Sequence, residues 1–204
     1  PVIFGGNYRL GDVVASQALS LSNTAAADGF SEKLDAAFSA VTGGATGTGA
    51  ISLLAAGGTN GINLLVGVDT STVGVKSGTV TVSLTSNGAG TSLLGTTARP
   101  AQVITVNAGN VFRLAAPSAI TSPLTFGGNY HVGDAVTPQA LSLTNAATAD
   151  GFSEKLDAAF TSVAGGATGA GAISLLGAGV SNSSSLFVSL NTSTVGSKSG
   201  SVTV

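Results

Sequence analysis

The chain contains no cysteine, methionine or tryptophan, and it carries very little charge. The missing cysteine excludes disulfides, thiolate metal ligands and cysteine nucleophiles. Only 8% of the residues are charged, and the formal net charge is -2. This balance excludes the dense basic surface with which proteins neutralise nucleic-acid phosphates. The composition therefore predicts a protein without thiol chemistry and without a nucleic-acid partner.

Long apolar runs are also missing, and histidine is almost absent. The apolar segment 50–56 ends at Gly57, well short of the roughly 18 residues that a membrane-spanning helix needs. We therefore predict no membrane span in this segment. The single histidine, His131, has no second histidine and no cysteine with which to form a metal site or a catalytic pair. We expect it at the surface.

Four acidic residues have the most potential for chemistry: Asp28, Glu32, Asp35 and Asp69. Calcium needs about six to eight oxygen ligands around one point, and the sequence has no Asp-x-Asp-x-Asp loop. Glu32 and Asp35 resemble a glycosidase carboxylate pair only in residue type, since no tryptophan platform for a sugar exists. We interpret Asp28 as a turn residue and the others as a solvated face. A weak calcium site between repeats is the alternative.

The glycine-rich stretch 43–49 does not meet the needs of a phosphate-binding loop, which requires a following helix and usually a lysine. We interpret it as a mobile hairpin loop. The abundant serines and threonines have no histidine partner that would make them nucleophiles. The sequence thus predicts no catalytic residue, no cofactor and no metal site, and we expect no enzyme activity.

What the chain does contain is a long internal repeat. Residues 1–82 and 123–204 align without a gap, and most of the aligned positions are identical. The block from Asp28 to Phe38 returns unchanged as Asp150 to Phe160. Duplication on this scale makes length rather than one specialised site, and it predicts one domain per repeat.

Within each repeat, apolar and polar residues alternate with a period of two. This pattern is typical of half-buried antiparallel strands, and turn signals rich in glycine and asparagine separate the strands. The expected strands are 2–4, 17–23, 51–54, 63–69, 78–85, 102–106 and 111–114. They predict an all-β chain of antiparallel β-sandwiches. A parallel β-solenoid is the alternative, although no period of about 20–30 residues is present.

Segment 30–41 fits two structures. Phe30, Leu34, Phe38 and Val41 have the spacing of an amphipathic helix. Phe30, Leu34 and Phe38 also share one face of an extended strand. We favour the strand, because all the neighbouring segments are expected to be strands.

The repeat also sets the expected domains: a first domain at 1–116, a linker at 117–122 and a second domain at 123–204. The second domain has no counterparts of strands 102–106 and 111–114, which close the first. A sandwich without its last strand exposes unpaired backbone groups and accepts a strand from elsewhere. One hypothesis is that neighbouring subunits join by strand exchange. The alternative is that the sequence simply stops before its closing strands.

The order of the motifs resembles a known family. It runs through Gly11-Asp12, Leu19-Ser20-Leu21-x-Asn23, Ala56-Gly57-Gly58 and Ser77-Gly78-Thr79-Val80-Thr81-Val82. This order is similar to that of the bacterial choice-of-anchor D repeats, relatives of the immunoglobulin-like ASPM/SPD-2/Hydin modules, and the resemblance covers residues 1–112 and 123–204. It implies tandem immunoglobulin-like sandwiches with a stalk, scaffold or adhesive role in secreted or surface-anchored bacterial proteins. It implies no catalytic residues.

The sequence therefore predicts a structural or adhesive tandem-repeat module of an extracellular or cell-surface fibre. Its expected partners are neighbouring copies of the same protein or further repeats of the same chain. The alternative is a glycan- or surface-binding accessory module of a larger secreted protein. Exposed Tyr8 and Tyr130 at matching places would support that alternative.

Overall fold

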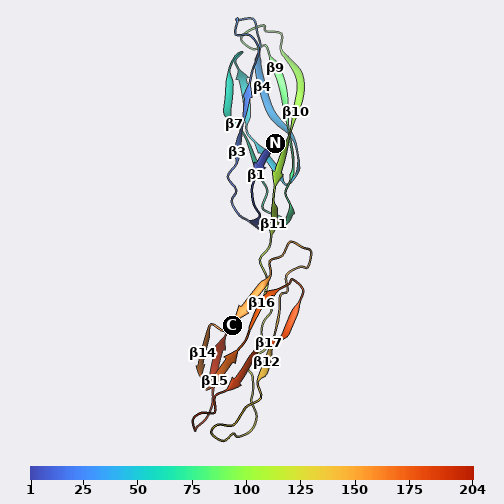
Figure 1. Cartoon of the computed structure of the whole chain (residues 1–204). Coiled ribbons are helices and arrows are strands. Elements are labelled where there is room, and N and C mark those ends of the chain that lie inside the picture. Colours follow the sequence, from blue (N-terminus) through green and yellow to red (C-terminus); the bar gives the residue numbers. More distant parts are fainter. The chain divides into compact units, whose positions relative to one another are not determined.

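A computed structural model describes all residues from Pro1 to Val204, which form only strands, turns and loops (Figure 1). The all-β class predicted from the sequence is confirmed. None of the elements is a helix of the length and hydropathy needed to cross a membrane. The chain divides into two compact units, residues 1–112 and residues 113–204.

The first unit contains three sheets. The largest has the strand order β1-β10-β9-β4-β6, formed by Val2–Phe4, Thr96–Ala108, Gly78–Asn87, Lys33–Gly43 and Ala50–Leu54. The second has the order β3-β7-β5, formed by Gln17–Ser22, Thr59–Val68 and Ala45–Thr48. The third has the order β2-β11-β8, formed by Tyr8–Arg9, Asn110–Phe112 and Gly74–Val75.

The alternating pattern of β9 brings its apolar side chains into the core. Val80 is fully buried, and Val82 is nearly so. Val66 from β7 and Val106 from β10 are also fully buried and belong to the same cluster as Val80. Burying each such side chain stabilises the fold by about 1.5–3 kcal/mol. Two of the sheets therefore share one core.

Strand pairing in this unit is mostly antiparallel. Only β1 with β10 and β2 with β11 pair in parallel. The β9 strand pairs antiparallel with β10 on one side and with β4 on the other. The solenoid alternative, which requires parallel rungs throughout, is therefore wrong.

Segment 30–41 is a strand, as the extended interpretation predicted. β4 pairs antiparallel with β9 along its length and with β6 over 34–37. The expected common face is wrong for Phe30, which lies before the strand and is 89% exposed. The amide of Phe30 donates to Asp28 Oδ1 at 2.9 Å. This turn removes Phe30 from the alternating pattern.

The glycine-rich stretch 43–49 is not the hairpin loop that its composition predicted. Ala45–Thr48 forms β5, which pairs antiparallel with β7. At Gly47 a Cβ atom would stand 2.8 Å from the ring of Phe38. The glycine is therefore needed for close approach of a ring to the backbone, and flexibility is not its role.

The second unit has shorter strands in smaller sheets. One sheet has the order β12-β17-β15, formed by Gln139–Thr144, Ser181–Leu190 and Ala167–Ala170. Two further pairs are β13 with β16, at Leu156–Ala159 and Ala172–Leu176, and β14 with β18, at Ser162–Gly165 and Gly200–Thr203. Its core consists of Leu141, Leu143, Ile173, Leu176, Leu186 and Val188.

The segment expected to be a linker, 117–122, lies inside the second unit, whose first residue is Arg113. Pro117 forms a β-bridge with Asn145, and Ile120 packs against the core. Apolar side chains near an incomplete core gain free energy by leaving water. The segment is therefore part of the fold of this unit.

Candidate functional site

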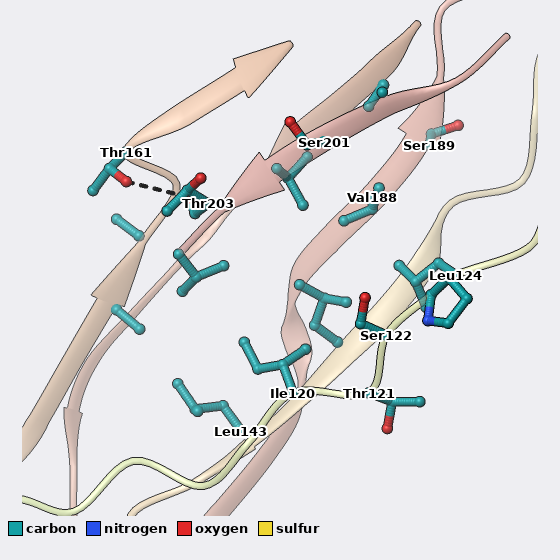
Figure 2. A pocket seen from close by; sticks show the side chains of 18 of the residues that line it. Ile120, Thr121, Ser122, Leu124, Leu143, Thr161, Val188, Ser189, Ser201 and Thr203 are labelled. Atoms are coloured by element: carbon teal, nitrogen blue, oxygen red, sulfur yellow. Dashed lines mark hydrogen bonds between the residues drawn. The ribbon is translucent and has the colours of Figure 1, made fainter. Parts of the chain in front are cut away.

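The second unit carries an open groove of about 1010 Å³ (Figure 2). Residues 117–118 and 120–126 line it together with parts of β13, β17 and β18. In Figure 2 the side chains of Ile120 and Leu143 lie across the groove from Ser201 and Thr203 of β18. Only two lining side chains, Asp157 and Lys198, are charged. The groove therefore suits an uncharged, largely apolar occupant.

The equivalent space in the first unit is filled by the long strand β10. There Ile104 pairs with Val80, and Val106 pairs with both Gly78 of β9 and Val2 of β1. In the second unit, Val80 corresponds to Val202. Within residues 113–204 no strand lies in the place of β10.

Exposure of equivalent side chains shows what β10 covers. Val80 is fully buried, but its counterpart Val202 is only half-buried. Val82 is 3% exposed, whereas its counterpart Val204 is 39% exposed. Apolar side chains that face the core in one repeat are thus in contact with water in the other. They would gain free energy if a strand covered them.

Backbone pairing is incomplete at the same place. β18 pairs with β14 on one edge only, although its counterpart β9 has a partner on both edges. Residues 124–126, the counterparts of β1, form no strand. Both sides of the groove therefore present backbone groups outside any ladder, which is the property of a sheet edge open to another strand.

The missing partner also divides a strand. In the first unit, β4 is continuous over Lys33–Gly43 because β9 pairs with its whole length. In the second unit the equivalent segment 155–165 is split into β13 and β14, and β13 pairs only with β16. Nearly identical local sequences thus form one long strand or two short ones, depending on whether a neighbouring strand is present.

The acidic residues identified in the sequence do not gather in one place. No group of three or more His, Asp or Glu side chains is placed to hold a metal ion. The amide of Ser71 donates to Asp69 Oδ1 at 2.8 Å, and hydrogen bonds from Ser71 hold the pKa of Asp69 below its usual value. The side-chain amide of Asn87 donates to Asp35 Oδ2 at 2.6 Å. Each carboxylate therefore fixes a local turn or strand.

Glu32 fastens the 88–95 loop of the first unit to β9. Ser86 Oγ donates to Glu32 Oε2 at 2.6 Å, and Ser92 Oγ donates to Oε1. The hydrogen bond from Ser86, followed by that from Ser92, holds the pKa of Glu32 below its usual 4.5. A lowered folded-state pKa contributes stability that is present above the unfolded pKa and is lost as the pH falls through the folded one.

We therefore expect the first unit to lose stability as the pH falls below about 4.5, and Glu32→Gln to reduce that loss. The glutamine keeps one acceptor oxygen and does not titrate. Thermal unfolding followed by circular dichroism at several pH values between about 3 and 6 measures the difference. Identical pH dependence in the two proteins would show that Glu32 has no part in it.

The remaining candidates lie at the surface or in local turns. His131 is exposed, and its amide donates to Asp134 Oδ2 at 2.7 Å. The hydroxyls of Tyr8 and Tyr130 each donate to a carbonyl three residues earlier, at 2.9 Å. Tyr8 packs against the core of the first unit, whereas Tyr130 is 40% exposed. The two rings therefore do not present a matching pair of exposed platforms.

Sequence reasoning missed the role of Asn145, which is completely buried. Its Nδ2 donates to the carbonyl oxygens of Glu154 and Leu176, at 3.1 Å each. Its Oδ1 accepts the amides of Ala116 at 3.0 Å and Ala147 at 3.2 Å. An asparagine that ends a strand in both repeats was the available signal, because buried amides are kept where they satisfy backbone groups.

No family model matches the chain, and neither the curated proteins nor the solved structures contain a match to it.

Proposed function

We propose that this chain is a structural or adhesive module of an extracellular or cell-surface bacterial fibre, built from tandem immunoglobulin-like sandwiches of the choice-of-anchor D type. The first unit supports this proposal, because side chains from two of its sheets meet in one core. The repeated plan of the second unit also supports it. Tandem units of this kind supply length and mechanical spacing.

The single observation that carries the proposal is the groove of the second unit, at the place that β10 fills in the first. We propose that a strand fills this groove, supplied by residues that follow Val204 in the same chain, by a further repeat or by a neighbouring copy. It would run antiparallel to β18 and parallel to residues 124–126, as β10 does between β9 and β1. Joining modules by added strands gives continuity along a fibre.

The pairing register of the first unit defines the strand that fits. A side chain in the position of Ile104 would lie opposite Val202, and one in the position of Val106 would lie opposite Gly200 and beside Leu124. Both positions need apolar side chains, since Val106 is fully buried and Ile104 packs on the same core. The positions between them, such as Thr105, face outward and tolerate polar residues.

The expected affinity is moderate. Burial of each apolar side chain contributes about 1.5–3 kcal/mol, while association of two molecules costs at least about 4 kcal/mol. A short strand with two or three buried side chains and a new backbone ladder is therefore expected to bind in roughly the micromolar to millimolar range.

A synthetic peptide with the sequence of residues 96–112 tests this proposal. We expect it to bind the 1–204 chain with one site and to shift the amide NMR signals of Val202 and Leu124. The matched control peptide carries aspartate in place of Ile104 and Val106, and we expect it to bind at least about tenfold more weakly, because it buries charge. Equal binding of both peptides, or shifts confined to the first unit, would contradict strand complementation.

A further inference from the structure

The segment that opens the second unit is held on a tip of that unit, formed by residues 145–154. The amide of Arg113 donates to the carbonyl of Phe152, and the amide of Glu154 donates to the carbonyl of Arg113, both at 2.9 Å. Arg113 Nη1 also contacts Asp150 Oδ2 at 2.7 Å and Ser153 Oγ at 3.0 Å. A short parallel bridge and two hydrogen bonds from one guanidinium nitrogen, one of them to a carboxylate, thus fix this arginine.

The segment then continues along the edge of β12. The amide of Ala116 donates to Asn145 Oδ1 at 3.0 Å, and the amide of Ala146 donates to the carbonyl of Ala116 at 2.6 Å. The amide of Ser118 donates to the carbonyl of Thr144 at 2.8 Å. Residues 113–118 therefore bind as an extended segment, through one acidic side chain and several backbone groups.

The first unit has the same tip, formed by residues 23–32. The amide of Phe30 donates to Asp28 Oδ1 at 2.9 Å, as that of Phe152 donates to Asp150 Oδ1 at 2.9 Å. Asn23 Nδ2 donates to the carbonyl oxygens of Glu32 and Leu54, at 3.1 Å and 3.0 Å. The first unit therefore has the same surface as the one that binds residues 113–118 in the second unit.

The two tips differ in whether a segment is bound to them, and the exposure of their side chains shows this. Phe30 is 89% exposed, whereas Phe152 is half-buried. Asn23 is 8% exposed, whereas Asn145 is fully buried. Asp28 uses Oδ1 for its own turn, and the hydrogen bonds that lower its pKa come from residues 28–31, with no basic side chain among them. The oxygen that binds arginine in the second unit therefore has no basic partner in the first.

We propose that the tip of the first unit, made by Asn23, Asp28, Phe30 and Ser31, is a docking site for an extended segment that carries an arginine, as the tip of the second unit binds residues 113–118. The segment has the character of residues 113–118: one arginine followed by small, uncharged residues. Arginine fits better than lysine, because its guanidinium is always charged and is less strongly hydrated than an ammonium group, so less is lost when it leaves water to meet the carboxylate. An acidic segment would be repelled by Asp28 and Glu32.

This inference goes beyond strand complementation and does not depend on it. The groove lies in the second unit and would bind a strand by burying its apolar side chains. The tip lies in the first unit and would bind a segment through an arginine side chain and backbone hydrogen bonds. A membrane surface is the competing occupant, since Phe30 is exposed and Leu93 and Leu94, 80% and 85% exposed, belong to the same unit. Membrane binding is therefore one outcome of the test.

The test is an NMR titration of the 1–204 chain with a synthetic peptide of residues 112–119, whose ends are blocked. We expect shifts of the amides of Phe30, Ser31 and Glu32, with few changes in the second unit, whose tip is already occupied. A peptide with alanine in place of its arginine is expected to bind about fivefold more weakly, the scale of an exposed ion pair. Asp28→Asn in the chain is expected to have the same effect while keeping the turn.

Asp134→Asn is the matched control, because it removes one negative charge from an exposed loop of the second unit. We expect it to leave peptide binding unchanged. Loss of the arginine without any change in binding would overturn the proposal, as would binding of the chain to phosphatidylcholine vesicles that Phe30→Ala abolishes, with no peptide binding. Neither result would affect the groove, since this probe contains no residue of β10.

Discussion

Extending the chain after Val204 with a second copy of residues 83–112 is expected to raise the melting temperature of the second unit by about 10 °C or more. The added residues supply the remainder of β9 and the whole of β10 and β11. In the first unit these elements bury Val106 and Val111 completely and pair with β1, β2 and β8. The same elements would cover Val202 and Val204 in the second unit.

The size of the effect follows from opposing contributions. Two fully buried valines and a partly buried isoleucine contribute roughly 4–8 kcal/mol, and ordering of the added backbone and its side chains offsets much of this. A net gain of about 2 kcal/mol corresponds to about 10 °C for a unit of this size. Hydrogen exchange at the amides of Leu186 and Val188 would report the stability of the second unit separately from the first.

The control is the same extension with aspartate at the added positions equivalent to Ile104 and Val106. Length and most of the composition are then nearly unchanged, but the strand cannot enter an apolar groove without burying charge. We expect this chain to melt as the unextended one does. If both extensions stabilised the second unit equally, the groove would not be the acceptor of a β10 strand.

Replacing Asn145 with alanine is expected to destabilise the second unit by about 3–5 kcal/mol. The side chain is completely buried and makes four hydrogen bonds to backbone groups. Alanine would leave two carbonyl oxygens and two amides without their partner, and each unsatisfied buried group costs about 1–3 kcal/mol. Guanidinium denaturation combined with hydrogen exchange measures the loss and assigns it to one unit.

Two further variants show how much of the loss depends on burial of the asparagine and on the number of its hydrogen bonds. Asn23→Ala removes the equivalent side chain from the first unit, where it makes three hydrogen bonds and is 8% exposed. We expect a smaller loss there, about 2–3 kcal/mol, because water reaches part of the site. Asn191→Ala removes an exposed turn residue whose Oδ1 accepts the amide of Ser193 at 2.9 Å, and we expect at most about 1 kcal/mol. Equal losses of stability on replacing Asn23 and Asn145 would show that the 113–118 segment adds no stability to the tip of the second unit.

The alternation of residues was enough to predict most strands of the first unit. The expected strand 2–4 coincides with β1, while 51–54 lies within β6 and 102–106 lies within β10. Alternation works because side chains of a strand point to opposite faces, so a half-buried sheet imposes a period of two on its sequence. It failed at Phe30 because a local turn, held by Asp28, interrupts the strand geometry.

The prediction of a loop from glycine content alone was wrong. A stretch such as 43–49 has the residues of a loop, yet Gly47 lies in β5 because the ring of Phe38 needs the space of its missing side chain. That requirement comes from another strand and cannot be read from the local sequence. The same is true of Asn145, because three of its four partners, Ala116, Glu154 and Leu176, lie in other segments of the second unit.

The sequence by itself determined the all-β class, the repeat and the shortage of titratable side chains, because each depends on residue type and spacing alone. Only the tertiary structure decided where the repeats differ. Asp28 and Asp150 stand in identical local sequences, but only Asp150 has an arginine against it. Val80 and Val202 stand in nearly identical strands, but only Val80 is fully covered. Pairing and burial depend on which distant segment arrives alongside, and two copies of one sequence with different neighbours therefore present different surfaces.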